Sequence, residues 1–155
     1  MVAEWYERHF QPHDNGFLPP LLVHHYHHAE EREKEKLYAR MAGEQALEQH
    51  AHSEALAYFR RALELTPPTE GEARFQILLG LEECHHWMGN RKAQESILRE
   101  IETAAALMQR PHWQAQGALR RARYGRAVGD YEAVIAAAKQ VLALFPQTGF
   151  HRYKA

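Results

Sequence analysis

The chain has 155 residues, and its 19 lysines and arginines nearly balance its 20 aspartates and glutamates. The length suits one domain, and the near-neutral charge provides no global basic field to draw the chain onto nucleic acid or an acidic membrane. The single cysteine, Cys84, excludes an internal disulfide framework and any C-x-x-C metal or redox motif.

We expect neither an export signal nor a membrane-spanning helix from this sequence. Its first ten residues, MVAEWYERHF, do not combine a basic start with an apolar core, as a signal peptide does. No apolar run approaches the roughly 20 residues that a membrane helix needs. We therefore expect a cytoplasmic protein, a setting that a lone cysteine also suits.

The elements expected along the chain are all helices. Proline and glycine fall between segments rich in good helix formers, and strand-like alternation of β-branched and polar residues is absent. About seven helices are predicted within a single domain, 1–155, after an N-terminal capping segment, 1–17, with a short helical stretch at 4–10. Their ranges are 18–29, 31–49, 52–65, 70–88, 91–108, 112–128 and 130–145, before a loose tail at 146–155.

Two stretches of the chain share one apolar spacing, at i, i+4, i+7 and i+8. In the first stretch the residues are Ala55, Phe59, Ala62 and Leu63, and in the second they are Val134, Ala138, Val141 and Leu142. A two-helix unit that recurs in this way is typical of helical repeat proteins.

Residues 39–67, ARMAGEQALEQHAHSEALAYFRRALELTP, closely resemble a tetratricopeptide repeat (TPR) unit. In that pattern small residues stand where two helices cross, larger residues fill between them, and a proline ends the second helix. The small residues here are Gly43, Ala55 and Ala62, the aromatic one is Phe59, and the proline is Pro67.

Two further stretches resemble the same family. Residues 118–146 contain the turn GDYEAV and close on Pro146, with Ala122 at the small position of the first helix. Val134, Ala138 and Val141 take the packing positions of the second helix. Residues 78–108 are a looser match, so the resemblance spans about three repeats.

The resemblance implies antiparallel helix hairpins stacked as a right-handed superhelix, with a concave groove that holds a peptide or protein. The chain is then a non-catalytic interaction module. The family's groove positions fall into three groups, which are Leu37, Arg40, Glu44, Leu47 and Glu48, then Gln76, Leu79, Glu83, His86 and Trp87, and then Gln116, Leu119, Arg123 and Arg126. Drawn from these groups, with the neighbouring Arg120, the residues predicted to bind the partner are Arg40, Glu44, Leu47, Glu83, His86, Trp87, Gln116, Arg120, Arg123 and Arg126.

The arginines of this set indicate one kind of partner. Arg123 and Arg126 are three residues apart and share a helix face, and with Arg120 they form a stripe suited to gripping carboxylates. An acidic peptide or a free C-terminal carboxylate is the natural ligand, although a solvated basic face explains the same pattern. Nucleic acid is not expected, because a few arginines without a wider basic field bind it weakly. Trp87 is either a core side chain or an anchor in the groove, and the sequence leaves both alternatives open.

A second, narrower resemblance covers residues 18–65. They are similar to the helical region that follows the ATPase module in bacterial LuxR-type regulators and cyclase-linked AAA+ or STAND ATPases. The matching residues are Leu21, Leu22, His24, His25, Tyr26, Ala42, Gly43, Glu44, Ala46, Leu47 and Phe59. The chain has no G-x-x-x-x-G-K-[ST] motif, so ATPase activity is not carried over. The alternative function is a regulatory or sensor segment of a larger signalling protein.

The 12 histidines raise a third alternative, a metal-binding protein. His24 and His28 are four residues apart on one helix face, but a bare pair is a poor site. The Glu-x-x-His spacings at 82–85 and 83–86 would make half of a di-iron site, and no clean second copy follows. The prediction is a protein that is not an enzyme and has no catalytic residues, cofactor or metal.

The N-terminal segment raises the question of self-association. Trp5, Tyr6 and Phe10 are too apolar to stand free in water. Either they fold back as a cap on the second helix, or they pair with a second copy to give a homodimer.

Overall fold

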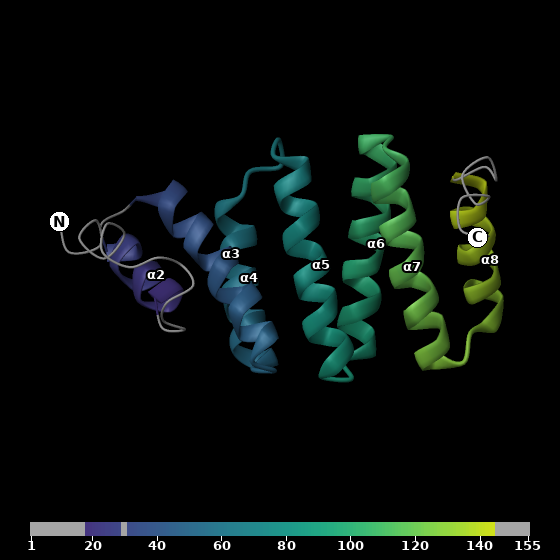
Figure 1. Ribbon diagram of the computed structural model, residues 1–155, viewed down its shortest axis with the longest axis horizontal. Helices are drawn as coiled ribbons and strands as arrows, with labels where there is room; N and C mark the ends of the chain where they lie inside the picture. Colours follow the sequence, from purple (N-terminus) through teal and green to yellow (C-terminus); the bar gives the residue numbers. More distant parts are fainter. Residues whose placement is uncertain (1–17, 29–30, 145–155) are drawn as a thin grey trace, which may run out of the picture. The chain divides into compact units, whose positions relative to one another are not determined.

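The computed structural model describes residues 18–28 and 31–144, in which the chain forms seven helices and no strand (Figure 1). The helices are α2 (Leu18–His28), α3 (Arg32–Glu48), α4 (His52–Leu65), α5 (Gly71–Trp87), α6 (Arg91–Met108), α7 (Pro111–Val128) and α8 (Tyr131–Leu144). The all-α prediction is confirmed, and these bounds lie within one residue of the predicted ones. The predicted segments 1–17, 4–10 and 146–155 lie outside the described residues.

The chain divides into two compact units, residues 1–89 (unit 1) and 90–155 (unit 2). Unit 1 holds α2 to α5, and unit 2 holds α6 to α8. In unit 1, α3 packs on α2 and α4, and α4 packs on α5; in unit 2, α7 packs on α6 and α8. Packing between consecutive helices is consistent with stacked hairpins. None of the described helices has the length and apolar character needed to cross a membrane.

Local chemistry fixes several helix ends. The Asn90 side chain accepts a hydrogen bond from the Ala93 amide at the start of α6, and Asp130 does the same for Ala133 at the start of α8. Pro111 occupies the first turn of α7, where its missing N–H costs nothing. Gly129 ends α7 with φ of 78°, a left-handed conformation that favours glycine.

The core of unit 1 is built around the ring of Phe59 on α4, which is 2% exposed. A Cβ atom placed on Gly43 of α3 would stand 2.9 Å from ring atom Cδ1, and one on Gly80 of α5 would stand 2.5 Å from Cζ. Both glycines therefore let helix backbone approach the ring more closely than any side chain would allow. The predicted small residues Ala55 and Ala62 are fully buried.

In unit 2, α7 and α8 approach each other closely at Gly125. A Cβ atom there would lie 2.8 Å from the carbonyl oxygen of Asp130 and 3.0 Å from Cγ2 of Val134. On α8, Ala137 is buried. The prediction that Ala138 packs inward is wrong, because its side chain is exposed. Ala138 directly follows the buried Ala137, and neighbouring side chains on a helix point about 100° apart.

An ion pair also joins the helices of unit 2. Arg121 on α7 donates from Nε and Nη2 to the two carboxylate oxygens of Glu102 on α6, at 2.7 and 2.8 Å. Two parallel hydrogen bonds of this kind fix the relative orientation of the two side chains in addition to pairing their charges. Arg121 therefore holds α7 against α6.

Candidate functional site

Two of the three predicted groups of partner-binding residues lie in unit 1. Arg40, Glu44 and Leu47 are on α3, whereas Glu83, His86 and Trp87 are on α5. Helices α3 and α5 are themselves in contact, so these groups occupy neighbouring helices. We name these six residues the α3–α5 face.

The most prominent side chain of this face is Trp87, which is 61% exposed. Its ring stacks on that of His52 at the start of α4, with centroids 6.0 Å apart and planes 9° from parallel. Its indole Nε1 donates a 2.7 Å hydrogen bond to Glu83 Oε1. The core interpretation of Trp87 is therefore wrong, and the indole is an exposed ring held by two neighbours.

More rings gather around Trp87. His86 meets its indole edge-on, with centroids 5.4 Å apart, and His50 lies edge-on to His52 at 6.1 Å. We call His50, His52, Glu83, His86 and Trp87 the Trp87 cluster. It brings the turn between α3 and α4 together with the end of α5, a juxtaposition that spacing along the sequence does not reveal.

Elsewhere on the α3–α5 face, charge is largely balanced. Arg40 Nε lies 3.8 Å from Glu44 Oε1, one helical turn away, and both side chains are substantially exposed. Exposed pairs of this kind contribute at most about 1 kcal/mol. Leu47 is half-buried near the end of α3.

The third predicted group lies on α7, in unit 2. Arg126 is exposed in the last turn, where a cation is favoured by the helix dipole. Arg120 and Arg123 are half-buried, and the Gln116 amide donates to His112 Nε2 at 2.9 Å. Within the predicted stripe, Arg126 is therefore more exposed to solvent than Arg120 and Arg123.

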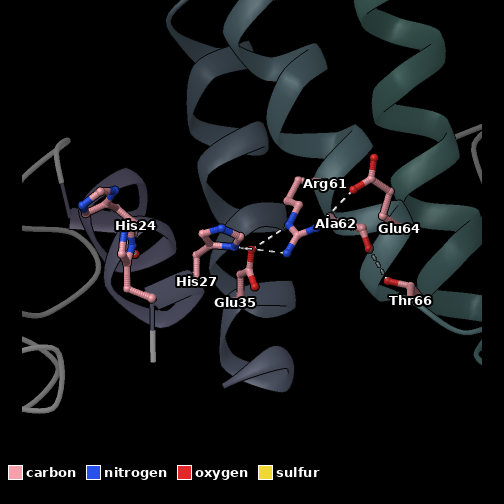
Figure 2. A network of polar contacts seen from close by, with 8 residues as sticks. His24, His27, Glu35, Arg61, Ala62, Glu64 and Thr66 are labelled. Carbon is pink, nitrogen blue, oxygen red and sulfur yellow. Dashed lines mark hydrogen bonds and ion pairs between the residues drawn. The ribbon is translucent and has the colours of Figure 1, made fainter. Parts of the chain in front are cut away.

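A polar network that sequence reasoning missed joins α2, α3 and α4 (Figure 2). Its centre is Glu35, whose side chain is 3% exposed and accepts a 2.6 Å hydrogen bond from Arg61 Nε. Arg61 also reaches Glu64, at 3.2 Å. His27 Nδ1 lies 3.1 Å from Glu35 Oε1 and 3.2 Å from Arg61 Nη2, so it donates to the carboxylate or accepts from the guanidinium, depending on its tautomer.

The electrostatics of Glu35 follow from this geometry. Burial by itself would raise the pKa of the Glu35 carboxyl, but hydrogen bonds and charge from Arg61 and His27 outweigh burial and lower that pKa. The carboxylate therefore stays ionised inside unit 1. It lies in the charged run EEREKEK, which suggests a solvated helix face, so the sequence offered no signal for it.

The candidate metal ligands, His24 and His28, lie next to each other on α2. His28 Nδ1 donates a 2.8 Å hydrogen bond to the His24 carbonyl oxygen, and the two rings are 4.4 Å apart. Over 18–28 and 31–144, no group of three or more histidine, cysteine or acidic side chains is arranged to hold a metal ion. Of the Glu-x-x-His pairs, Glu82 and His85 are buried, and burial together with the Arg60 charge lowers the pKa of His85.

Cys84 should be chemically inert in the folded protein. Burial raises the pKa of its thiol to about 12, so almost no thiolate exists at neutral pH. We expect iodoacetamide to alkylate Cys84 very slowly in native protein and fully in urea, as followed by mass spectrometry. Rapid stoichiometric labelling without urea would contradict this placement of the thiol.

Unit 2 contains a pocket of about 320 Å³ on α6, α7 and α8. Its walls are mostly small residues such as Ala105 and Gly117, with Gln114 and Gln140 as polar groups. Glu102, the acid in its lining, is already bound by Arg121. The pocket holds none of the predicted site residues.

The described residues thus define an all-α protein of packed helix hairpins with an ordered, exposed tryptophan. A scan against models of protein families finds no match, and a search of the curated proteins finds no similar sequence.

Proposed function

We propose that this chain is a TPR-type interaction module whose hairpins stack as a right-handed superhelix and which binds a peptide or protein partner. The α3–α5 face is the binding surface, and Trp87 is its anchor. The observation that carries this proposal is the 61% exposure of an indole that two neighbours hold in one orientation.

Binding through a pre-oriented, exposed indole is favourable because it costs little conformational entropy. A large aromatic surface left in water gains free energy when a partner covers it, and tryptophan is enriched among residues that dominate binding. Since His52 and Glu83 already orient the ring, little side-chain freedom is left to lose on binding. A pre-oriented aromatic side chain is therefore a favourable anchor.

The proposed role is non-catalytic. The thiol of Cys84 is buried with a pKa of about 12, and His85 is buried with a lowered pKa. Neither group is placed to act as a nucleophile or general base toward an external substrate. A regulatory segment of a larger signalling protein would use the same surface toward another part of its own chain.

The preference for an acidic partner depends on α7. Arg126 is exposed there, and Arg120 and Arg123 lie within two turns of it. Because α7 belongs to unit 2, its contribution is tested separately from that of Trp87.

Capture from a lysate of the source cells tests the proposal. Wild-type protein, Trp87→Ala and Leu107→Ala are immobilised in parallel; Leu107 is 80% exposed on α6 and serves as the matched apolar control. We expect a protein retained by wild type and Leu107→Ala to be lost from Trp87→Ala. Equal retention by all three would contradict the assignment of Trp87.

The double variant Arg123→Glu plus Arg126→Glu forms a second arm, after circular dichroism has shown that it is folded. Weaker capture by this variant would support an acidic partner. Unchanged capture would mean that the α7 arginines form a solvated face.

A further inference from the structure

Helix α8 exposes an apolar stripe on a side that α7 does not cover. The exposed fractions are 69% for Tyr131, 55% for Ile135 and 65% for Leu142, and Ala138 between them is also exposed. Ala137, in contrast, is buried. α8 therefore has one apolar side within unit 2 and a second that meets solvent.

The spacing of this stripe is that of a helix–helix seam. Tyr131, Ile135, Ala138 and Leu142 follow one another at steps of four, three and four residues, which is the d, a, d, a pattern of a coiled coil. Such a pattern keeps all four side chains on one line facing a second helix. The stripe is thus suited to a helix as its partner.

We propose that the partner is α8 of a second copy of this chain, packed antiparallel across a two-fold axis. The stripe is symmetric about its midpoint, between Ala136 and Ala137. An antiparallel register therefore pairs every member with another member: Ile135 with Ala138 of the second copy, and Tyr131 with Leu142. Setting a large residue against a small one in the two central layers lets the helices approach closely.

The charges beside the stripe favour the same arrangement. Glu132 and Lys139 are exposed, and each directly follows a d position, so both lie on one flank of the seam. In the antiparallel register Glu132 lies across from Lys139 of the second copy, and the two-fold axis repeats this pair. In a parallel register the e positions of the two helices would lie on opposite flanks of the seam, so Glu132 and Lys139 could not pair across it.

The size of the seam sets the strength of the dimer. α8 has 14 residues and is therefore about 21 Å long. A seam between two such helices is smaller than a standard protein–protein interface, so the dimer is weak and depends on concentration. This dimer uses unit 2 and does not depend on the α3–α5 face, so either proposal can fail without the other.

Sedimentation equilibrium over a wide range of concentrations tests the seam with matched variants of the full chain. Ile135→Glu puts a charge at the centre of the seam, whereas Ala136→Glu puts one at the adjacent exposed residue outside it. We expect wild type and Ala136→Glu to dimerise alike, and Ile135→Glu to dimerise at least about tenfold more weakly. Both positions are exposed on one helix, and circular dichroism should show that each variant is folded.

Charge reversal tests the antiparallel register. Glu132→Lys and Lys139→Glu should each weaken the dimer, and the two changes together should restore it, because opposite charges then face one another again. A second weakening in the double variant would overturn the register.

Two results would overturn the proposal itself. One is a wild-type chain that stays monomeric at every concentration, as it would if its own residues 145–155 covered the stripe. The other is a dimer that Ile135→Glu leaves unchanged, as it would if the copies met through the N-terminal segment.

Discussion

Replacing Phe59 with alanine should lower the free energy of unfolding by about 3–5 kcal/mol. The ring lies between Gly43 and Gly80, and neither residue has a side chain that can move into the space left behind. Unfolding by urea, followed by circular dichroism, measures the change. A loss below about 1 kcal/mol would contradict the central position of this ring.

A double-mutant cycle with Gly80→Ala isolates the contact itself. In the wild type the new methyl group meets the ring at 2.5 Å, so overpacking of about 1–3 kcal/mol opposes a gain of about 1 kcal/mol in helix propensity. With Phe59→Ala the ring is gone, and Gly80→Ala should stabilise the protein by roughly 1 kcal/mol. The same effect in both backgrounds would show that α5 does not contact the ring closely.

The second large effect is expected at Arg61. Arg61→Met removes the strongest partner of Glu35 and leaves its carboxylate buried, which should cost about 3 kcal/mol. Replacing both residues with methionine should cost less than the single change, because no unpaired charge remains. Glu64→Gln is the control: it removes only an exposed partner of Arg61, so it should change stability by less than about 0.5 kcal/mol.

The same carboxylate makes stability depend on pH. Because Glu35 has a lower pKa in the folded chain than its usual value of 4.5, the unfolded chain takes up the proton first as the solution is acidified. The stability that Glu35 contributes is therefore complete above about pH 4.5 and is lost as the pH falls through the lowered folded value. Unfolding midpoints measured down to low pH should fall less steeply for Glu35→Gln than for the wild type.

Periodicity and proline and glycine breaks predicted the helices well, since local chemistry sets helix ends. The repeat pattern that residues 39–67 resemble placed Gly43 and Phe59 correctly in the core of unit 1. Gly80 was not predicted, because it lies in the stretch 78–108, where the repeat pattern is loose, and its role depends on a ring from another helix. Close approaches between helices depend on packing, so the spacing of residues along the sequence does not predict them.

The errors and omissions in the predicted surface have the same origin. An aromatic residue at helical spacing looks the same in the sequence whether it is buried or exposed. Spacing therefore could not decide whether Trp87 is a core side chain or a groove anchor. Ala138 was misplaced because spacing along the sequence does not fix how α8 is rotated about its axis against α7. Glu35 was overlooked because it lies in a charged run, which usually faces solvent. Its burial depends on an ion pair with Arg61, which lies on another helix, α4.

Above all, we propose that Trp87 anchors a partner on the α3–α5 face. The most direct test of this claim is the equilibrium affinity of the captured partner for wild type, Trp87→Ala and Leu107→Ala. We predict that Trp87→Ala weakens binding at least about 30-fold, which corresponds to about 2 kcal/mol, and that Leu107→Ala leaves it unchanged. An affinity for Trp87→Ala equal to that of the wild type would contradict the claim and place the binding surface elsewhere on the chain.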